Sequence, residues 1–463
     1  MKIKYKYIVA IIYTVALFLD RADLTIVNIS LPTLARHFNV SIVATDWVNL
    51  SFLLALAIAI PISVWLGGKF GLKRVFITSM LLFGLGSTLC AFAPNLLILI
   101  ILRFIHGIGG GMLIPVGMTL LYRTFDKSEY ASITSFTFIP SLSAPAIAPL
   151  LGGVLLSIWN WHAVFLVTGP IALSLALFAA WRLTEDDYQN SASLDWPGFI
   201  LASVILIDLF YLLSTVARDH HSLLFISSVV IFIPVIILFI YHEQRRTYPL
   251  INLNFFKNKT FIQANLAQLC FQISHFGAIF LVSMYLQIGA GISVILTGLI
   301  MGSQAISAMF TSRVSVHLFN RYNAELPIIL GFLGIGIVSP CVLLINHPNL
   351  WGYGVVLFLI RGLFSGLCGT PIQALSVIGF SKNEVGSINT VFSACRQVSI
   401  SFGVALSSIT ITASLAALGF NTTNNLSPHQ AFKVFSPGFF SITAITVIGV
   451  LVTYYLRPTH KKL

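Results

Sequence analysis

The stretch LFLDRADLTIVNISLP, residues 17–32, places three ionisable side chains inside a long apolar run. Asp20, Arg21 and Asp23 share about one turn of a helix. The run follows a basic chain start and continues to Pro32, and no small-residue cleavage site interrupts it. We therefore interpret it as an uncleaved first transmembrane helix and not as a signal peptide. Because ionisable groups in mid-membrane are costly, these charges are candidates for function.

The composition of the whole chain is that of a polytopic membrane protein. Of its 463 residues, 57% are hydrophobic and 9% are charged, and the mean hydropathy is +0.93. All seven tryptophans fall at the edges of apolar stretches, as in an interfacial aromatic belt. Apolar runs of about 20 residues predict an all-α integral membrane protein with about fourteen transmembrane helices. We expect them near residues 7–29, 44–66, 75–93, 96–121, 131–157, 161–182, 197–217, 221–241, 260–287, 290–312, 325–345, 350–376, 385–415 and 435–456.

Several classes of function are disfavoured by what the sequence lacks. The longest expected loops are 183–196, 242–259 and 416–434, so a soluble catalytic or output domain is not expected. The five cysteines lie in apolar spans without metal-ligand spacing, and we interpret them as packing residues. The sequence has no GxxxxGK[ST] phosphate-binding loop and no nucleophile–base pair in its short loops. We therefore expect no enzyme, no cofactor and no metal, and a membrane sensor is less favoured than a transporter.

The net charge of +12 is explained by topology and does not predict nucleic-acid binding. If the N-terminus is cytoplasmic and the helices alternate, nearly all Lys and Arg residues fall on the cytoplasmic side. Only Arg36, Arg218 and Lys433 fall on the outer side. The remaining basic residues within helices are Arg21, Arg103, Arg361 and Arg396. This asymmetry predicts that both termini are cytoplasmic.

A weak internal repeat divides the chain. Residues 102–115 read LRFIHGIGGGMLIP and residues 360–371 read IRGLFSGLCGTP, each an arginine followed by glycines and a proline. Glycines permit close helix approach in lipid, although chance recurrence in glycine-rich helices is the alternative explanation. Two related six-helix halves are typical of transporters. We expect an N-terminal half at 1–190, a two-helix insert at 191–245 and a C-terminal half at 246–463.

Motifs along nearly the whole chain resemble one family, the fourteen-spanner drug:proton antiporters of the major facilitator superfamily. The segment DLTIVNISLP at 23–32 is similar to the family's D-x-T-I-V-N-V-A-L-P pattern in the first helix. Further similar segments follow in the family's order: Trp47, LGGKFGLKR at 66–74, Arg103 to Gly109, APLLGG at 148–153, LDWPG at 194–198, MYLQ at 284–287 and Arg361-Gly362. Each motif is weak alone, and together they are specific.

The resemblance implies a function and a location. It implies proton-coupled export of amphipathic or hydrophobic solutes by alternating access, in a bacterial inner membrane. The implied partners are a small-molecule substrate, protons, the lipid bilayer and, by family analogy, a periplasmic adaptor protein. It also implies gating roles for seven residues: Lys69, Gly71, Lys73, Arg74, Pro149, Gly152 and Gly153. Gly68, Ala144 and Ala148 depart from the family pattern. The departures at Gly68 and Ala148 favour the alternative, an importer or uniporter of a specific metabolite.

Two sets of polar residues inside helices are candidates for the transport chemistry. Asp23, with Arg103 expected to face it and Asp20 nearby, is the candidate for proton coupling; a static helix-orienting network is the alternative. Asn265, Gln268, Gln272 and His275 share one helical face and predict either a solute-binding surface or interhelical hydrogen bonds. With Asn28, Asn389 and Arg396 they form the expected substrate cavity. Asp208, in the insert, is interpreted as structural.

The charge asymmetry generates a topology prediction. Tags at residue 1, within 242–259 and at residue 463 should all be cytoplasmic, and tags within 416–434 should be external. The measurement is labelling of single cysteines in intact cells with a membrane-impermeant thiol reagent. External labelling of a cysteine within 242–259 would contradict the fourteen-helix topology.

Overall fold

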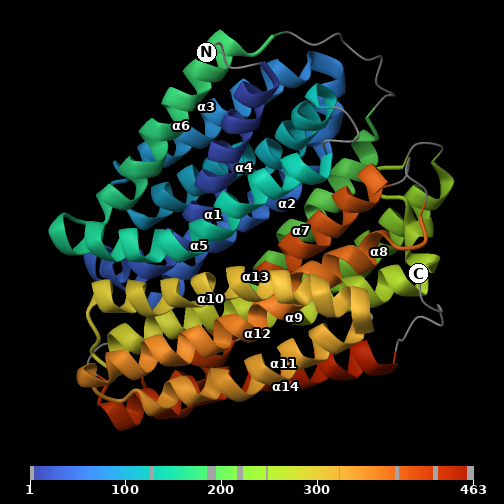
Figure 1. The fold of residues 1–463 in the computed structure, drawn as a ribbon. Coiled ribbons are helices and arrows are strands. Elements are labelled where there is room, and N and C mark those ends of the chain that lie inside the picture. Colours follow the sequence, from blue (N-terminus) through green and yellow to red (C-terminus); the bar gives the residue numbers. More distant parts are fainter. Residues whose placement is uncertain are drawn as a thin grey trace.

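The computed structural model describes residues 5–125, 130–184, 194–215, 223–246, 249–322, 324–380, 385–420 and 426–455. Within these ranges the chain forms fourteen α-helices and no strand (Figure 1). The helices are α1 (Tyr5–Phe38), α2 (Asp46–Phe70), α3 (Leu72–Cys90), α4 (Leu96–Thr124), α5 (Tyr130–Ile158), α6 (His162–Arg182), α7 (Trp196–Thr215), α8 (Leu223–Arg245), α9 (Lys259–Met284), α10 (Val294–Tyr322), α11 (Glu325–Val338), α12 (Trp351–Val377), α13 (Val385–Ala417) and α14 (Pro428–Tyr455). Short turns are η1 (Ile42–Thr45), η3 (Leu253–Lys257), η4 (Tyr285–Gly289), η5 (Ser339–Leu344) and η6 (Pro348–Leu350).

The helix lengths suit a membrane. In the described part of the chain, 11 helices are long and apolar enough to cross a bilayer, and α5 and α7 contribute shorter apolar segments. The first helix, α1, is 34 residues long and carries Asp20, Arg21 and Asp23 near its middle. The all-helical prediction of about fourteen helices is confirmed.

The helices pack as two groups with a peripheral pair. Helices α1–α6 contact one another, helices α9–α14 contact one another, and α7 pairs with α8. Figure 1 shows the first group in blue to green and the second in yellow-green to red, as two layers of long helices. Helix α7 packs against α2 of one group and α13 of the other.

Glycines set the closest helix approaches within each group. A Cβ on Gly111 of α4 would lie 2.8 Å from the carbonyl oxygen of Leu56 on α2. On the fourth helix of the second group, α12, a Cβ on Gly366 would lie 2.5 Å from the carbonyl oxygen of Ala308 on α10. The second and fourth helices of both groups therefore meet backbone to backbone, as small residues allow in lipid.

The two groups are joined on the side away from the N-terminus of α1. Ser283 Oγ on α9 donates to the carbonyl of Asn28 on α1 at 2.8 Å, and Gln287 Nε2 donates to the carbonyl of Ile29 at 3.4 Å. Helix α5 meets α10 there as well, because a Cβ on Gly153 would lie 2.8 Å from the carbonyl oxygen of Val294. This arrangement closes the groups against each other at that side.

Charged side chains tie the peripheral pair together. Asp195, just before α7, accepts a hydrogen bond from Gly198 N at 3.3 Å and lies 2.7 Å from His242 Nε2 on α8. Arg246 Nε lies 3.4 Å from the same carboxylate. Glu243 Oε2 accepts from the backbone N–H of Ile251, which begins the segment leading to α9. The carboxylate expected at the start of the insert thus anchors both of its helices.

The contact of Gly153 with α10 generates a prediction. Gly153→Val should push α5 from α10, because overpacking a close contact costs about 1–3 kcal/mol, which is about 5–150-fold in a two-state population. A cysteine at Leu24, between the two groups, should then react faster with a thiol reagent added from the closed side. Gly352→Val is the matched control, because a Cβ there meets nothing within 4 Å. Equal labelling rates in both variants would contradict the prediction.

Candidate functional site

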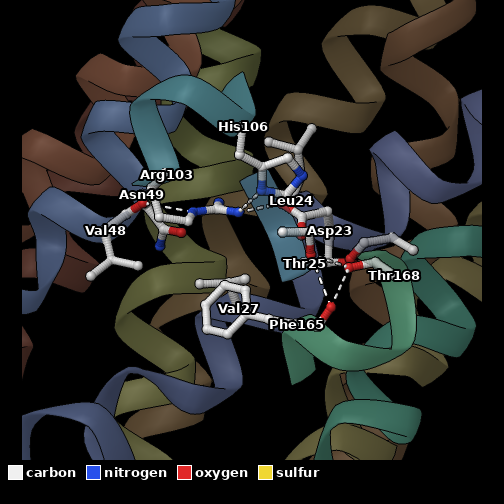
Figure 2. Close-up of polar contacts among 12 residues, drawn as sticks. Asp23, Leu24, Thr25, Val27, Val48, Asn49, Arg103, His106, Phe165 and Thr168 are labelled. Carbon is white, nitrogen blue, oxygen red and sulfur yellow. Dashed lines mark hydrogen bonds and ion pairs between the residues drawn. The ribbon is translucent and has the colours of Figure 1, made fainter. Parts of the chain in front are cut away.

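An ion pair buried in the first group of helices forms the centre of the candidate site. Arg103 Nη1 on α4 lies 2.6 Å from Asp23 Oδ2 on α1, and both side chains are 0% exposed. Sequence analysis expected these residues to face each other, and the structure brings them into direct contact (Figure 2). The contact is therefore a charge-assisted hydrogen bond as well as an ion pair.

The guanidinium of Arg103 is held by three further kinds of contact. Its Nε donates to the carbonyl of Val48 on α2 at 3.1 Å. Its Nη1 donates to His106 Nδ1, one turn further along α4, at 3.0 Å. The guanidinium carbon lies 4.1 Å from the centre of the Phe52 ring and 5.9 Å from that of Phe165, which are cation–π distances. Arg103 therefore connects α1, α2, α4 and α6.

The tautomer of His106 follows from its partner. A guanidinium only donates, so Nδ1 accepts, and the neutral ring carries its hydrogen on Nε2. The ring packs edge-on between Phe52 and Phe83, at centroid distances of 5.0 and 4.2 Å. Among the described residues, Asp23 Oδ1, Arg103 Nη2 and His106 Nε2 have no hydrogen-bond partner. The pair thus keeps one carboxylate oxygen without a hydrogen bond among the described residues.

The second expected carboxylate, Asp20, is buried but less tightly held. It is 1% exposed, and its Oδ2 lies 4.0 Å from Arg21 Nε. It also interacts electrostatically with Asp23 and with Arg396 on α13 of the other group. Asp20 therefore lies between the buried pair and the interface of the two groups.

A small pocket lies between the two groups, next to these charges. Its lining comes from α1, α2, α9 and α13: Leu24, Asn28, Asn49, Phe52, Leu53, Phe276, Ile400 and Val404. Asn28 donates to the carbonyl of Leu24 at 2.8 Å and accepts from Asn49 Nδ2 at 3.0 Å. Of the residues expected in the substrate cavity, Asn28 is the one that lines this pocket.

The second group contains its own buried arginine, without a carboxylate. Arg361 on α12 is 0% exposed and donates to Gln304 Oε1 at 2.5 Å, Ser274 O at 3.1 Å and Ser339 Oγ at 3.2 Å. Gln304 in turn lies 3.4 Å from His275 Nδ1. The repeated arginines, Arg103 and Arg361, thus each form the centre of a polar network in their own group.

Two of the four polar residues expected to line a cavity from α9, Asn265 and His275, instead make hydrogen bonds within or between helices. Gln268 and Gln272 are buried, and Asn265 and His275 are half-buried. Asn265 donates to the carbonyl of Phe261 on its own helix, and His275 joins the Arg361 network. The side chain of Asn389 lies outside the described residues, so its cavity role stays a prediction.

The residues expected to act in gating lie at two helix contacts. Gly71, between α2 and α3, has φ +87°, a conformation that favours glycine, and Lys69 lies over the Trp65 ring at 4.7 Å. Lys73 and Arg74 begin α3. The backbone carbonyl of buried Pro149 on α5 packs closely against Gly298 of α10. Gly152 contacts Ile26 of α1.

One group of candidate metal ligands occurs among the described residues, at the insert. Asp195, His242 and Glu243 bring their ligand atoms within 4.8 Å of one another. His242 already lies at hydrogen-bond distance from Asp195, and the Arg246 cation lies beside the same carboxylate. A second cation would compete with both, so the geometry favours an anchoring cluster.

Sequence reasoning missed most of the partners of the two arginines. His106 was recognisable as a neighbour, because it lies three residues after Arg103 on the same helical face. Gln304, Ser339 and the carbonyl of Val48 belong to other helices, and no local pattern indicates them.

Comparisons with known proteins agree with this architecture. The model of the Major Facilitator Superfamily matches residues 13–404. A protein of Pectobacterium atrosepticum named "Putative multidrug resistance protein MdtD" is 31% identical over 399 residues, which are 85% of this chain and 84% of that protein. A protein of the same name from Klebsiella pneumoniae is 28% identical over 442 residues, covering 94% of this chain and 91% of the relative.

Solved structures share the fold at low identity. A D-xylose–proton symporter aligns with TM-score 0.71 and 13% identity, covering 99% of this chain and 100% of that one. A bacterial homologue of the human lysosomal transporter Spinster, in an inward-facing and occupied conformation, aligns with TM-score 0.70 and 13% identity over 98% and 97% of the two chains. These likenesses concern the fold alone.

The buried pair predicts a large stability effect. Arg103→Ala should lower the free energy of unfolding by about 3–5 kcal/mol, because it leaves the Asp23 carboxylate buried without its partner. Adding Asp23→Asn to that variant should recover part of the loss, since the second change removes the uncompensated charge. Thermal unfolding of purified protein measures both effects, and Arg313→Ala, at an exposed arginine of α10, is the control. Equal melting of the Arg103 and Arg313 variants would refute this account.

Proposed function

The chain belongs to the Major Facilitator Superfamily and is a membrane transporter, not an enzyme, and we propose that it exports amphipathic or hydrophobic solutes in exchange for protons. The observation that carries the proposal is the buried Asp23–Arg103 pair next to the pocket between the helix groups. The relatives named as multidrug resistance proteins support the solute class.

The proton step follows from the geometry of the pair. When Asp23 is ionised, its Oδ2 holds the Arg103 guanidinium, which also contacts α2 and α6. A proton on the carboxylate removes the charge that Arg103 compensates and weakens this link. Leu24, the neighbour of Asp23 on α1, lines the pocket. A movement of Asp23 on losing its ion pair would therefore also move a residue of the wall where a solute would bind.

Alternating access supplies the movement. In this proposal α1–α6 and α9–α14 are the two halves, and they rock about the pocket between them. The contacts of Ser283 with Asn28 and of Gly153 with α10 close one side and must separate when that side opens. Protonation shifts the population between the two arrangements only if it favours one of them. Each charge moved supplies about 2.3 kcal/mol per 100 mV of membrane potential.

The predicted orientation in the membrane gives the direction of solute and proton movement. With both termini in the cytoplasm, the side closed in this structure faces outward, and the solute enters from the cytoplasm. Protons then move inward down their gradient as the solute moves outward.

Asp23→Asn tests the coupling. We expect this variant to lose proton-driven solute accumulation in proteoliposomes while it still binds substrate, because the amide keeps the shape but cannot titrate. The pH dependence of binding should flatten for the same reason. The solute panel comprises hydrophobic dyes, amphipathic drugs and polar metabolites, each measured with and without an imposed pH gradient.

Asp208→Asn is the matched control, since it makes the same change on α7, away from the pocket. It should transport as the parent protein does, with any loss confined to expression or stability. Normal gradient-driven transport by Asp23→Asn would remove the coupling role from Asp23. Uptake of one polar metabolite without a response to pH would instead favour the importer or uniporter.

A further inference from the structure

The charged side chains along the inner parts of the helices are predominantly positive. Arg21, Arg103, Arg361 and Arg396 lie in α1, α4, α12 and α13, and the carboxylates that interact with them are Asp20 and Asp23. Among the described helices α9–α14, Glu325 at the start of α11 is the only acidic residue. The second group therefore brings arginines to the interior without acidic partners of its own.

One of these arginines lies at the end of the pocket. Ile400 and Val404, which line the pocket, follow Arg396 on α13 at intervals of four residues, so the three side chains share one helical face. On α1, the pocket residues Leu24 and Asn28 follow Asp20 at the same spacing. Both helices run into the pocket from these charged residues, so Asp20 and Arg396 each lie one turn before it.

The guanidinium of Arg396 is incompletely satisfied. Its Nε is buried and has no hydrogen-bond partner among the described residues. It interacts electrostatically with Arg21, Asp20 and Tyr13, and Arg21 also lies within 4.0 Å of Asp20. Asp20, the carboxylate nearest to this end of the pocket, is already paired with Arg21. A buried cation in that position is stabilised by a further anionic acceptor.

The body of the pocket is apolar. Phe52 and Leu53 of α2, Phe276 of α9, and Ile400 and Val404 of α13 line it. These walls match an apolar chain or ring in chemistry, and when the groups separate to admit such a solute, its head group would lie toward the positively charged end.

We propose that the preferred solute of this transporter is an amphipathic anion, whose carboxylate or similar group is bound by Arg396. The inference rests on the proposed export function and narrows its substrate class by charge. A cationic amphiphile would place a third positive charge beside Arg21 and Arg396. An anion offsets the excess charge and supplies the acceptor that Arg396 Nε lacks.

A series of three amphiphiles with the same apolar chain tests the charge preference. Decanoate, decanol and decyltrimethylammonium are titrated at neutral pH into the full-length protein in nanodiscs, and calorimetry is corrected with empty nanodiscs. We expect decanoate to bind tightest and decyltrimethylammonium weakest. Arg396→Gln should weaken decanoate binding by about tenfold or more, as loss of a charge-assisted hydrogen bond does, and should leave decanol binding nearly unchanged.

Two further variants distinguish a specific role of Arg396 from an effect of net charge. Arg396→Lys retains the charge and should retain most of the preference for decanoate over decyltrimethylammonium, even if the planar guanidinium geometry is lost. Arg313→Gln removes an exposed arginine of α10 and should leave all three affinities unchanged. An effect equal in Arg396→Gln and Arg313→Gln would show that net charge alone is responsible and would overturn the role of Arg396.

The outcomes separate this inference from the export proposal. Tighter binding of decyltrimethylammonium than of decanoate, with gradient-driven export of cationic dyes, would overturn the anion preference and leave export standing. Binding of decanoate that depends on Arg396, without any gradient-driven export, would support the charge preference and contradict the export proposal.

Discussion

The buried ion pair between Asp23 and Arg103 is the interaction on which the rest of the first helix group depends. Burying either charge alone in an apolar bundle is costly, so the pair requires α1 and α4 to stay packed together. Arg103 Nη1 and Asp23 Oδ2 lie 2.6 Å apart. The same guanidinium takes the carbonyl of Val48, the nitrogen of His106 and the faces of two phenylalanines. One side chain thereby contacts four helices of the group, α1, α2, α4 and α6.

The buried arginines of the two halves have different kinds of hydrogen-bond acceptor. Arg103 has a carboxylate, whereas Arg361, at the related position of the repeat, has an amide oxygen, a serine hydroxyl and a backbone carbonyl. Neutral acceptors satisfy the hydrogen bonds of a guanidinium without cancelling its charge. The first half thus pairs its arginine with a titratable side chain, while the second half leaves the charge of its arginine uncancelled. This asymmetry links the proposed coupling to Asp23 and the proposed preference for anions to the other half.

The closure at one side of the molecule relies on backbone contacts. Ser283 and Gln287 donate to carbonyls of α1, and Gly153 lets α5 meet the backbone of α10. Such contacts can separate without leaving a buried charge unpaired, unlike the ion pair inside the first half. In the proposed alternating-access cycle, these contacts are the ones that would separate, while the helices that the ion pair joins inside the first half would stay packed together.

The sequence by itself determined the membrane location, the number of helices and the pairing of Asp23 with Arg103. Apolar runs of bilayer length must form helices that satisfy their own backbone, and a buried carboxylate needs a cation. Only the tertiary structure decided what lies around these residues. It showed that Arg361 donates to Gln304 and that Asn28 lines the pocket, whereas Asn265 and His275 of α9 make helix contacts. It also showed that the buried Nε of Arg396 has no hydrogen-bond partner among the described residues. Those contacts depend on how each helix is rotated about its axis, and in lipid that rotation is set by packing against neighbouring helices, which the periodicity of one helix does not encode.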